Sequence, residues 1–150
     1  MGRAQSRMGS AQSSRYQLQG EIDHGRAVGN ALLLHSQSGN LQEVRRWFPL
    51  PPYTDIKCRS PGGATPLIAA AANGHADIVR LLLENHADVN AGTHQGRTAL
   101  LCAAGRAQRP ENSRQIVRLL LKSGADPHAK SQEGQSPIDF KVVNEVLSEG

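Results

Sequence analysis

The sequence predicts an all-α fold, a solenoid of about four stacked helix-turn-helix units joined by hairpin-like loops. The first observation is a repeat: the pattern that starts at Thr65 starts again at Thr98, 33 residues later. A period of this length is typical of solenoids built from helix pairs. The second observation is that each copy places a cap residue before a run of apolar residues at helical spacing.

The copy at residues 63–91 shows why one unit should form two helices. The hydroxyl of Thr65 can accept a hydrogen bond from a free amide at a helix start, and Pro66 suits the first helical position. Gly74 can end this helix in the left-handed conformation, and Asp77 then suits the first turn of a second helix. The second helix carries apolar residues at Ile78, Val79, Leu82 and Leu83. Neither helix can bury its apolar face alone, so the units must stack.

A third restart, at Ser136 and Pro137, shows that one copy is longer than the others. Ser136 follows Thr98 by 38 residues, which is one period plus five. The landmarks on either side of 105–115 keep their normal spacing, so the extra residues lie within that stretch. We therefore expect Arg106 to Glu111 to form an enlarged turn between the two helices of the third unit.

These restarts divide the chain into a tail and a repeat domain. The predicted boundaries are a basic Ser/Gln/Arg-rich disordered tail at 1–22 and a repeat domain at 23–150, comprising a degenerate first repeat (27–62), a second (63–95), a third with the five-residue insertion (96–133) and a truncated C-terminal cap (134–150). The last unit has no glycine break. It is therefore either a shortened cap or one continuous helix.

The landmarks resemble those of the ankyrin repeat, whose T-P-L-H, A-A, G-H, I-V, L-L-L and G-A-D elements occur in this order. The resemblance implies a structural role for His75, the histidine of G-H. The histidine of T-P-L-H is replaced by Ile68, Leu101 and Asp139, so we expect its hydrogen bond to the cap residue to be absent in every copy. The glycine of G-A-D is replaced in the second repeat by His86, which we expect to adopt a positive φ angle.

The resemblance also implies a concave protein-binding groove, formed by the connector tips and the exposed side of the first helices. Transferred by position, the contact residues would be Arg59, Asn73, His94, Gln95, Arg97, Arg106, Gln132 and Glu133. The segment 97–118 contains five arginines (97, 106, 109, 114 and 118) and one acidic residue, Glu111, which gives it a formal net charge of +4. This cluster is either a solvated helix face or a docking site for an acidic protein segment on the enlarged turn.

Composition and spacing give no support for an enzyme, a cofactor or a metal site. The six histidines lack metal-ligand spacing, and no serine lies in a nucleophile-elbow context. Nucleic acid is disfavoured because aromatic residues for stacking make up only 3% of the chain. Cys58 and Cys102 predict unpaired thiols, which suit the cytoplasm or the nucleus. The sequence contains no run of 18 apolar residues, so it predicts no membrane-spanning helix.

The N-terminal tail allows three interpretations. Arg3, Arg7 and Arg15 make it basic, and Gly2 lies in a loose N-myristoylation pattern, although the charge at Arg3 disfavours acylation. An Arg- and Ser-rich start also resembles an organelle transit peptide. The third interpretation is a solvated tail. An acylated tail would give only weak membrane contact.

The sequence therefore predicts a monomeric, non-catalytic protein interaction module that acts as an adaptor, scaffold or inhibitor. One alternative is a membrane-proximal adaptor held by an acylated basic tail. The other is the targeting fragment of a larger multidomain protein.

Overall fold

The computed structural model describes residues 30–48, 56–106 and 110–150. After a helical segment at 30–38, the elements are α2 (Leu41–Trp47), α3 (Pro66–Asn73), α4 (Ala76–Glu84), α5 (Ala99–Ala104), α6 (Pro110–Lys122), a 3-10 turn (Pro137–Asp139) and α7 (Lys141–Glu149). Outside the helices, these ranges hold an isolated bridge between Gly92 and Thr98 but no strand. The predicted all-α solenoid is confirmed. The tail at 1–22, with Gly2, lies outside the described residues.

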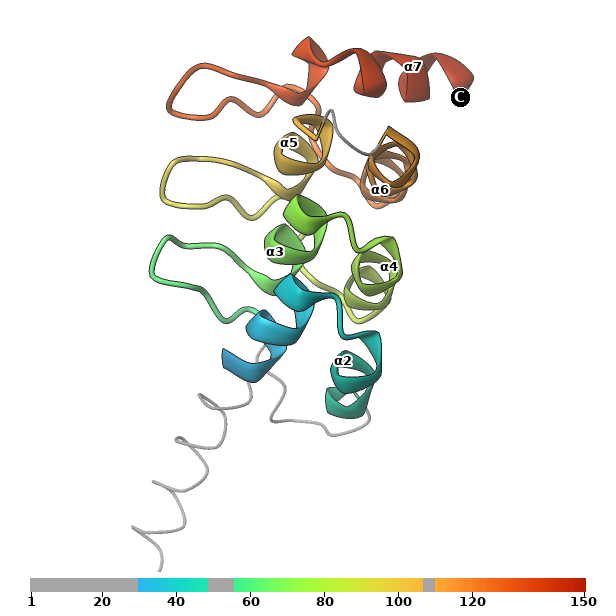
Figure 1. Cartoon of the computed structure of the whole chain (residues 1–150). Helices are drawn as coiled ribbons and strands as arrows, with labels where there is room; N and C mark the ends of the chain where they lie inside the picture. The colour runs from blue at the N-terminus through green and yellow to red at the C-terminus, as the bar shows by residue number, and fades with distance from the viewer. Residues whose placement is uncertain (1–29, 49–55, 107–109) are drawn as a thin grey trace, which may run out of the picture.

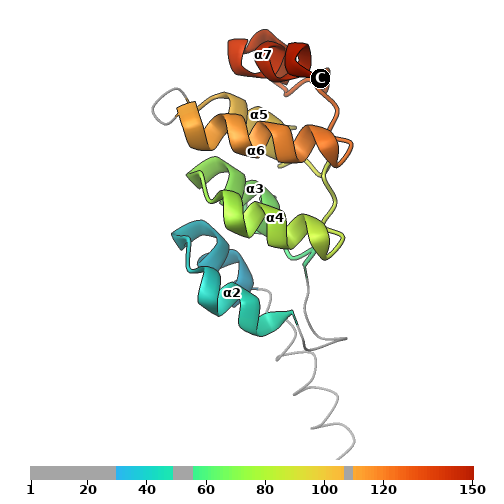
Figure 2. The same cartoon turned by 90° about the vertical axis from the view of Figure 1, so that its right-hand side faces the viewer.

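The helices form two layers, with the connectors projecting to one side (Figure 1). The first layer stacks the segment 30–38, α3 and α5. The second layer stacks α2, α4, α6 and α7, and Figure 2 views the stack from this side. Each repeat thus contacts mainly its neighbours, and the core runs as a continuous seam between the layers.

The predicted helix caps are confirmed. The hydroxyls of Thr65 and Thr98 accept hydrogen bonds from the backbone N–H groups of Ile68 and Leu101, each across 3.3 Å. Gly74 has a φ of 79° and ends α3 in the left-handed conformation. These local signals set the start of α3 and α5 and the end of α3, and so the direction in which each apolar face points.

Aliphatic side chains from successive repeats fill the core. The largest fully buried residues are Leu32, Val44, Pro66, Leu67, Ile78, Val79, Leu82, Leu100, Ile116, Val117, Leu120 and Val143. Equivalent positions recur one repeat apart, as in Leu82 and Leu120, so each repeat adds one layer to the same core. Alanines in α3 and α5 are buried as well, which lets these short helices pack closely.

His86 adopts a φ of 65°, as predicted, and is the one non-glycine residue with positive φ in the described part of the chain. Its counterpart in the third repeat is Gly124, with a φ of 91°. The connector therefore has the same backbone conformation in both repeats. In the second repeat a side chain with a Cβ adopts it, at a cost of about 1 kcal/mol.

The insertion lengthens a helix more than it enlarges a turn. When Ile78 is aligned with Ile116, α6 begins four residues earlier than α4 does. The expected turn from Arg106 to Glu111 is therefore wrong at its end, because Pro110 and Glu111 form the first turn of α6. Proline at the first position and an acid in the first turn both favour a helix start there. Residues 107–109 lie outside the described part.

The last unit is a shortened cap, not one continuous helix. The 3-10 turn replaces the first helix, and the extended backbone of Phe140 separates it from α7. The carboxylate of Asp139 accepts hydrogen bonds from the N–H (2.9 Å) and the hydroxyl (2.8 Å) of Ser136. These bonds lower the pKa of Asp139. We expected no copy to form a hydrogen bond between the T-P-L-H histidine position and the cap residue. This expectation is wrong for the last unit, because the side chain of Asp139 can accept such a bond, whereas those of Ile68 and Leu101 cannot.

No helix among the described residues is long and apolar enough to cross a membrane.

Candidate functional site

The connector tips form one hydrogen-bonded surface. Successive tips lie side by side in Figure 1. The backbone N–H of His94 donates to the carbonyl of Gly62 across 3.1 Å. Gln132 donates its N–H to the carbonyl of Gln95 (2.9 Å) and its side-chain amide to the carbonyl of His94 (2.8 Å). Five of the exposed tip residues together are called the tip surface: Arg59, His94, Gln95, Gln132 and Glu133.

Arg59 holds two connectors together. Its Nη1 donates to the carbonyl of Gly63 in its own connector (3.0 Å) and to that of Gly92 in the next (2.8 Å). Because both acceptors are neutral, the guanidinium keeps its full positive charge. Arg59 therefore supports the spacing of the tips and can still attract a negative group.

Arg97 and Glu133, both predicted contact residues, bind each other. The Nη2 of Arg97 lies 3.2 Å from Oε2 of Glu133, and the side chains are 43% and 54% exposed. This exposed ion pair contributes little to stability, but it cancels the charge that Arg97 alone would offer to a partner. The sequence analysis placed both residues in the groove without pairing them.

Arg106 is a structural link between the second and third repeats. It donates from Nη1 to the carbonyl of Ala72 near the end of α3, and its guanidinium packs against the backbone of Gly74. The half-buried side chain is therefore a cap for α3 as well as a cation at the surface.

His75 makes the equivalent contact one repeat earlier. Its Nε2 lies 3.1 Å from the carbonyl of Gln37, and its ring packs against Gly39. The predicted structural role of His75 is confirmed. Arg106 occupies the equivalent position in the third repeat. His75 contacts the carbonyl of Gln37, two residues before Gly39, and Arg106 contacts that of Ala72, two residues before Gly74.

Asn73 and Cys102 lie on the first helices. Asn73 is exposed at the end of α3 and donates to the carbonyl of Ala69 across 2.8 Å. Cys102 is a half-buried free thiol in α5, and burial raises its pKa, although the nearby Arg97 lowers it. A raised pKa keeps the thiol protonated and unreactive. Cys58, like Cys102, takes part in no disulfide among the described residues.

The arginine cluster does not form an uncompensated basic patch. Arg97 pairs with Glu133, Arg114 with Glu145 and Arg118 with Glu149, while Arg109 lies outside the described residues. Three of these arginines are therefore paired with acids that follow them in the chain, and two of those acids come from the last unit. Sequence spacing could have indicated these ion pairs, because both pairs between α6 and α7 join residues 31 apart, which is close to one repeat length.

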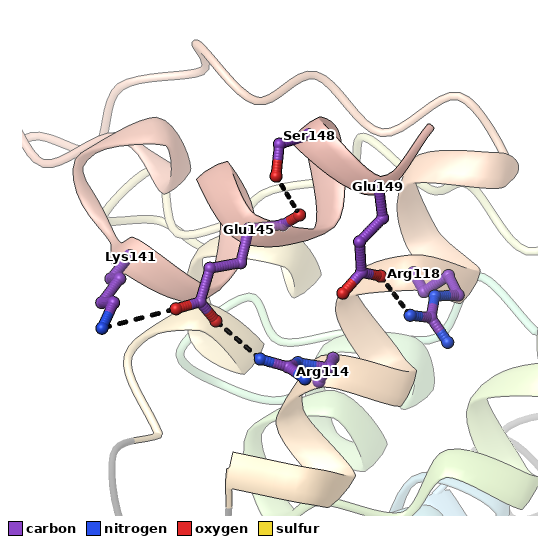
Figure 3. Close-up of polar contacts among 6 residues, drawn as sticks. All are labelled: Arg114, Arg118, Lys141, Glu145, Ser148 and Glu149. Carbon is purple, nitrogen blue, oxygen red and sulfur yellow. Dashed lines mark hydrogen bonds and ion pairs between the residues drawn. The ribbon is translucent and has the colours of Figure 1, made fainter.

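Glu145 is the centre of the contact between α6 and α7 (Figure 3). Its carboxylate lies 2.7 Å from Nη2 of Arg114 and 3.5 Å from Nζ of Lys141. The hydrogen bond from Arg114 lowers the pKa of Glu145, and the same bond raises the pKa of Arg114. Both groups are thus held in their charged forms at neutral pH. Within the described ranges, no group of three or more His, Cys, Asp or Glu could hold a metal ion.

Comparison with known proteins identifies the family. A family model described as ankyrin repeats (3 copies) matches residues 30–131, about two thirds of the chain.

Three curated relatives illustrate the match. A probable E3 ubiquitin-protein ligase, XBOS33 of Oryza sativa subsp. japonica, is 42% identical over 77 residues, which cover 51% of this chain and 15% of the relative. The E3 ubiquitin-protein ligase XBAT33 of Arabidopsis thaliana is 39% identical over 77 residues, with the same coverage. Ankyrin repeat and SOCS box protein 16 of Mus musculus is 51% identical over 51 residues, 34% of this chain and 11% of the relative. The chain spans less than a sixth of each relative, but its repeats and the family match show that it belongs to the ankyrin repeat family of non-catalytic protein-interaction modules.

Proposed function

We propose that this domain is an adaptor, scaffold or inhibitor that binds a partner protein through the tip surface and the exposed side of α3 and α5. The supporting observation is the set of hydrogen bonds between tips, above all those that Gln132 makes to Gln95 and His94. They hold the connectors in place before a partner arrives. Binding then costs little conformational entropy, which favours affinity.

The best candidates for direct contact are His94 and Gln95. Both side chains are exposed at the central tip, and the hydrogen bonds described above use their backbone groups. The imidazole of His94, which lies against Gly63, and the amide of Gln95 can therefore bond to a partner while these backbone hydrogen bonds stay intact. Gln132 and Arg59 would contribute the flanks.

An acidic partner segment would bind Arg97 in competition with Glu133. Replacing each charged side chain by an uncharged one should therefore change the affinity in opposite directions. Glu133→Gln should strengthen binding, and Arg97→Gln should weaken it. Equal effects of the two substitutions would refute an acidic partner at the tips. The proposal of a protein-binding tip surface would survive that result.

Affinity capture followed by calorimetry tests the tip surface. The partner captured by the full chain is identified by mass spectrometry, expressed, and titrated with wild type and with the double variant His94→Ala/Gln95→Ala. We expect a loss of at least about tenfold in affinity, as for central interface residues. Lys122→Ala is the matched control, since it removes an exposed side chain at the far end of α6. If the double variant binds as tightly as the control, the tip surface is not the binding site.

A second proposal is that the repeats recruit a protein to a ubiquitin-ligase system. It is supported by four relatives named as E3 or probable E3 ubiquitin-protein ligases, which are 35–42% identical over about half of the chain. The repeats cover a small part of each. Determining the transcript beyond both ends of this sequence tests the idea, since a ligase domain in the same protein would support it. Its absence, together with a captured partner set that lacks ubiquitin-pathway components, would refute it.

We propose that the domain works as a monomer in the cytoplasm or the nucleus. The described array buries its core between its own layers, which requires no second copy. Light scattering of the purified chain tests the first point, and imaging of the tagged full-length protein tests the second. A concentration-independent dimer or a membrane-bound signal would contradict them.

A further inference from the structure

We infer that a hollow between α5, α6 and α7 is a second docking site, for an acidic peptide segment that carries one bulky apolar side chain. This inference deepens the proposed function and rests on it, but it concerns a site separate from the tip surface. The hollow encloses about 340 Å³. That is at the lower end of the range of roughly 300–1,000 Å³ for small-ligand sites, so it suits a side chain and not a folded domain.

The hollow exists because the last unit is shortened. In the second and third repeats, a first helix of eight or six residues covers the neighbouring repeat. In the last unit a 3-10 turn of three residues takes this place, and the chain passes at once into α7. The end of α5 is therefore met by the single ring of Phe140, which approaches the backbone of Gly105.

Apolar groups line the inner wall of the hollow. They come from Ala104 at the end of α5 and from Phe140 and Val142 before and within α7. Phe140 and Val142 are only half-buried, whereas Ala104 is buried. An aromatic or large aliphatic side chain placed here would complete a layer of the core. Burying it would supply much of the binding energy.

The rim of the hollow is positively charged. It carries Arg106, Arg114 and Lys141 against one carboxylate, Glu145, a formal balance of +2. Arg106 bonds to the neutral carbonyl of Ala72, so its charge is not cancelled there. Lys141 is 90% exposed and lies 3.5 Å from Glu145, which already binds Arg114. Figure 3 shows the two cations approaching different oxygens of Glu145.

Charge complementarity therefore selects an acidic segment. Carboxylates on either side of the apolar residue would meet Lys141 and Arg106, and a basic segment would be repelled. A polyanion without apolar groups would leave the wall formed by Phe140 and Val142 exposed to water. The combination of wall and rim thus favours a peptide in which an apolar residue lies between acids.

Amide chemical shifts of the ¹⁵N-labelled full chain test this site with defined peptides. The probe is a capped peptide with a central phenylalanine and two glutamates on each side. The comparators replace the phenylalanine by alanine, or all the glutamates by lysine. We expect saturable shifts at Ala104, Phe140 and Val142 with the probe. The alanine peptide should bind at least about tenfold more weakly, and the lysine peptide should not bind.

A charge reversal on the protein provides an independent test of the same site. Lys141→Glu removes the excess positive charge of the rim at a highly exposed position and should weaken binding of the probe about fivefold. Lys122→Glu makes the same change eight residues beyond Arg114, about 12 Å along α6, and should leave binding unchanged. No saturable shift, equal binding of the alanine peptide, or equal effects of the two variants would overturn the inference. Shifts confined to the tip surface would overturn it as well, while leaving the proposed function intact.

Discussion

Glu145 on α7 accepts a hydrogen bond from Arg114 on α6 across 2.7 Å, although 31 residues separate them in the sequence. This ion pair links α7 to α6 in the last unit, where a 3-10 turn replaces the first helix. Arg118 and Glu149 repeat the arrangement one turn further along. The end of the solenoid is thus held by ion pairs as well as by its buried valines, Val143 and Val146.

We predict that Glu145→Gln lowers the melting temperature at pH 7 and that the difference from wild type narrows as the pH falls below about 4.3. The pKa of Glu145 is lowered in the folded protein. Its contribution is therefore complete above the ordinary glutamate pKa of about 4.3 and is lost as the pH falls through the lowered folded value. Thermal unfolding at a series of pH values measures this. A difference that stays the same at every acidic pH measured would show that the loss is one of packing and not of charge.

We predict that His86→Gly stabilises the domain, whereas Gly124→Ala destabilises it. Both positions have positive φ, at 65° and 91°. Glycine relieves strain of about 1 kcal/mol at position 86, partly offset by the greater freedom of the unfolded chain. A Cβ at Gly124 meets no atom within 4 Å, so strain alone should cost about 1 kcal/mol there. Chemical denaturation measures both variants, and effects of the same sign would contradict the account.

We predict that Leu82→Ala lowers the free energy of unfolding by about 2–5 kcal/mol. Leu82 is fully buried in the second layer, so truncation leaves a cavity between repeats. Leu34→Ala is the matched control, because Leu34 is 61% exposed and should change stability by less than about 0.5 kcal/mol. Urea unfolding of both variants decides, and a small effect at Leu82 would be incompatible with the observed register.

We predict that Arg106→Ala lowers the free energy of unfolding by about 1 kcal/mol, through the lost cap on α3. Arg106→Lys keeps the charge but not the planar guanidinium that packs on Gly74, so it should recover only part of the loss. Hydrogen exchange at the amides of Gly74 and His75 shows whether the effect is local. Full recovery by lysine would mean that charge, and not the cap, is what Arg106 contributes.

Much of the fold could be predicted from sequence because its signals are local. Thr65 and Gly74 act within one helix, and the positive φ of His86 follows from one position in one connector. The site was harder to predict, because Arg97 and Arg106 were assigned as free contact residues by position alone. Glu133 lies 36 residues after Arg97, in the next connector, and Ala72 lies in the repeat before Arg106, so no local pattern identifies these partners.

The sequence by itself determined the period, the helix caps, the place of the insertion and the membership of a stacked helical family. Each of these depends on backbone preferences and apolar spacing within about one unit. Only the tertiary structure decided that the insertion extends α6, that α7 neutralises Arg114 and Arg118, and that the shortened last unit leaves a hollow beside Phe140. These features arise when residues one repeat apart come face to face, and stacking, not local preference, sets which charges and apolar groups meet.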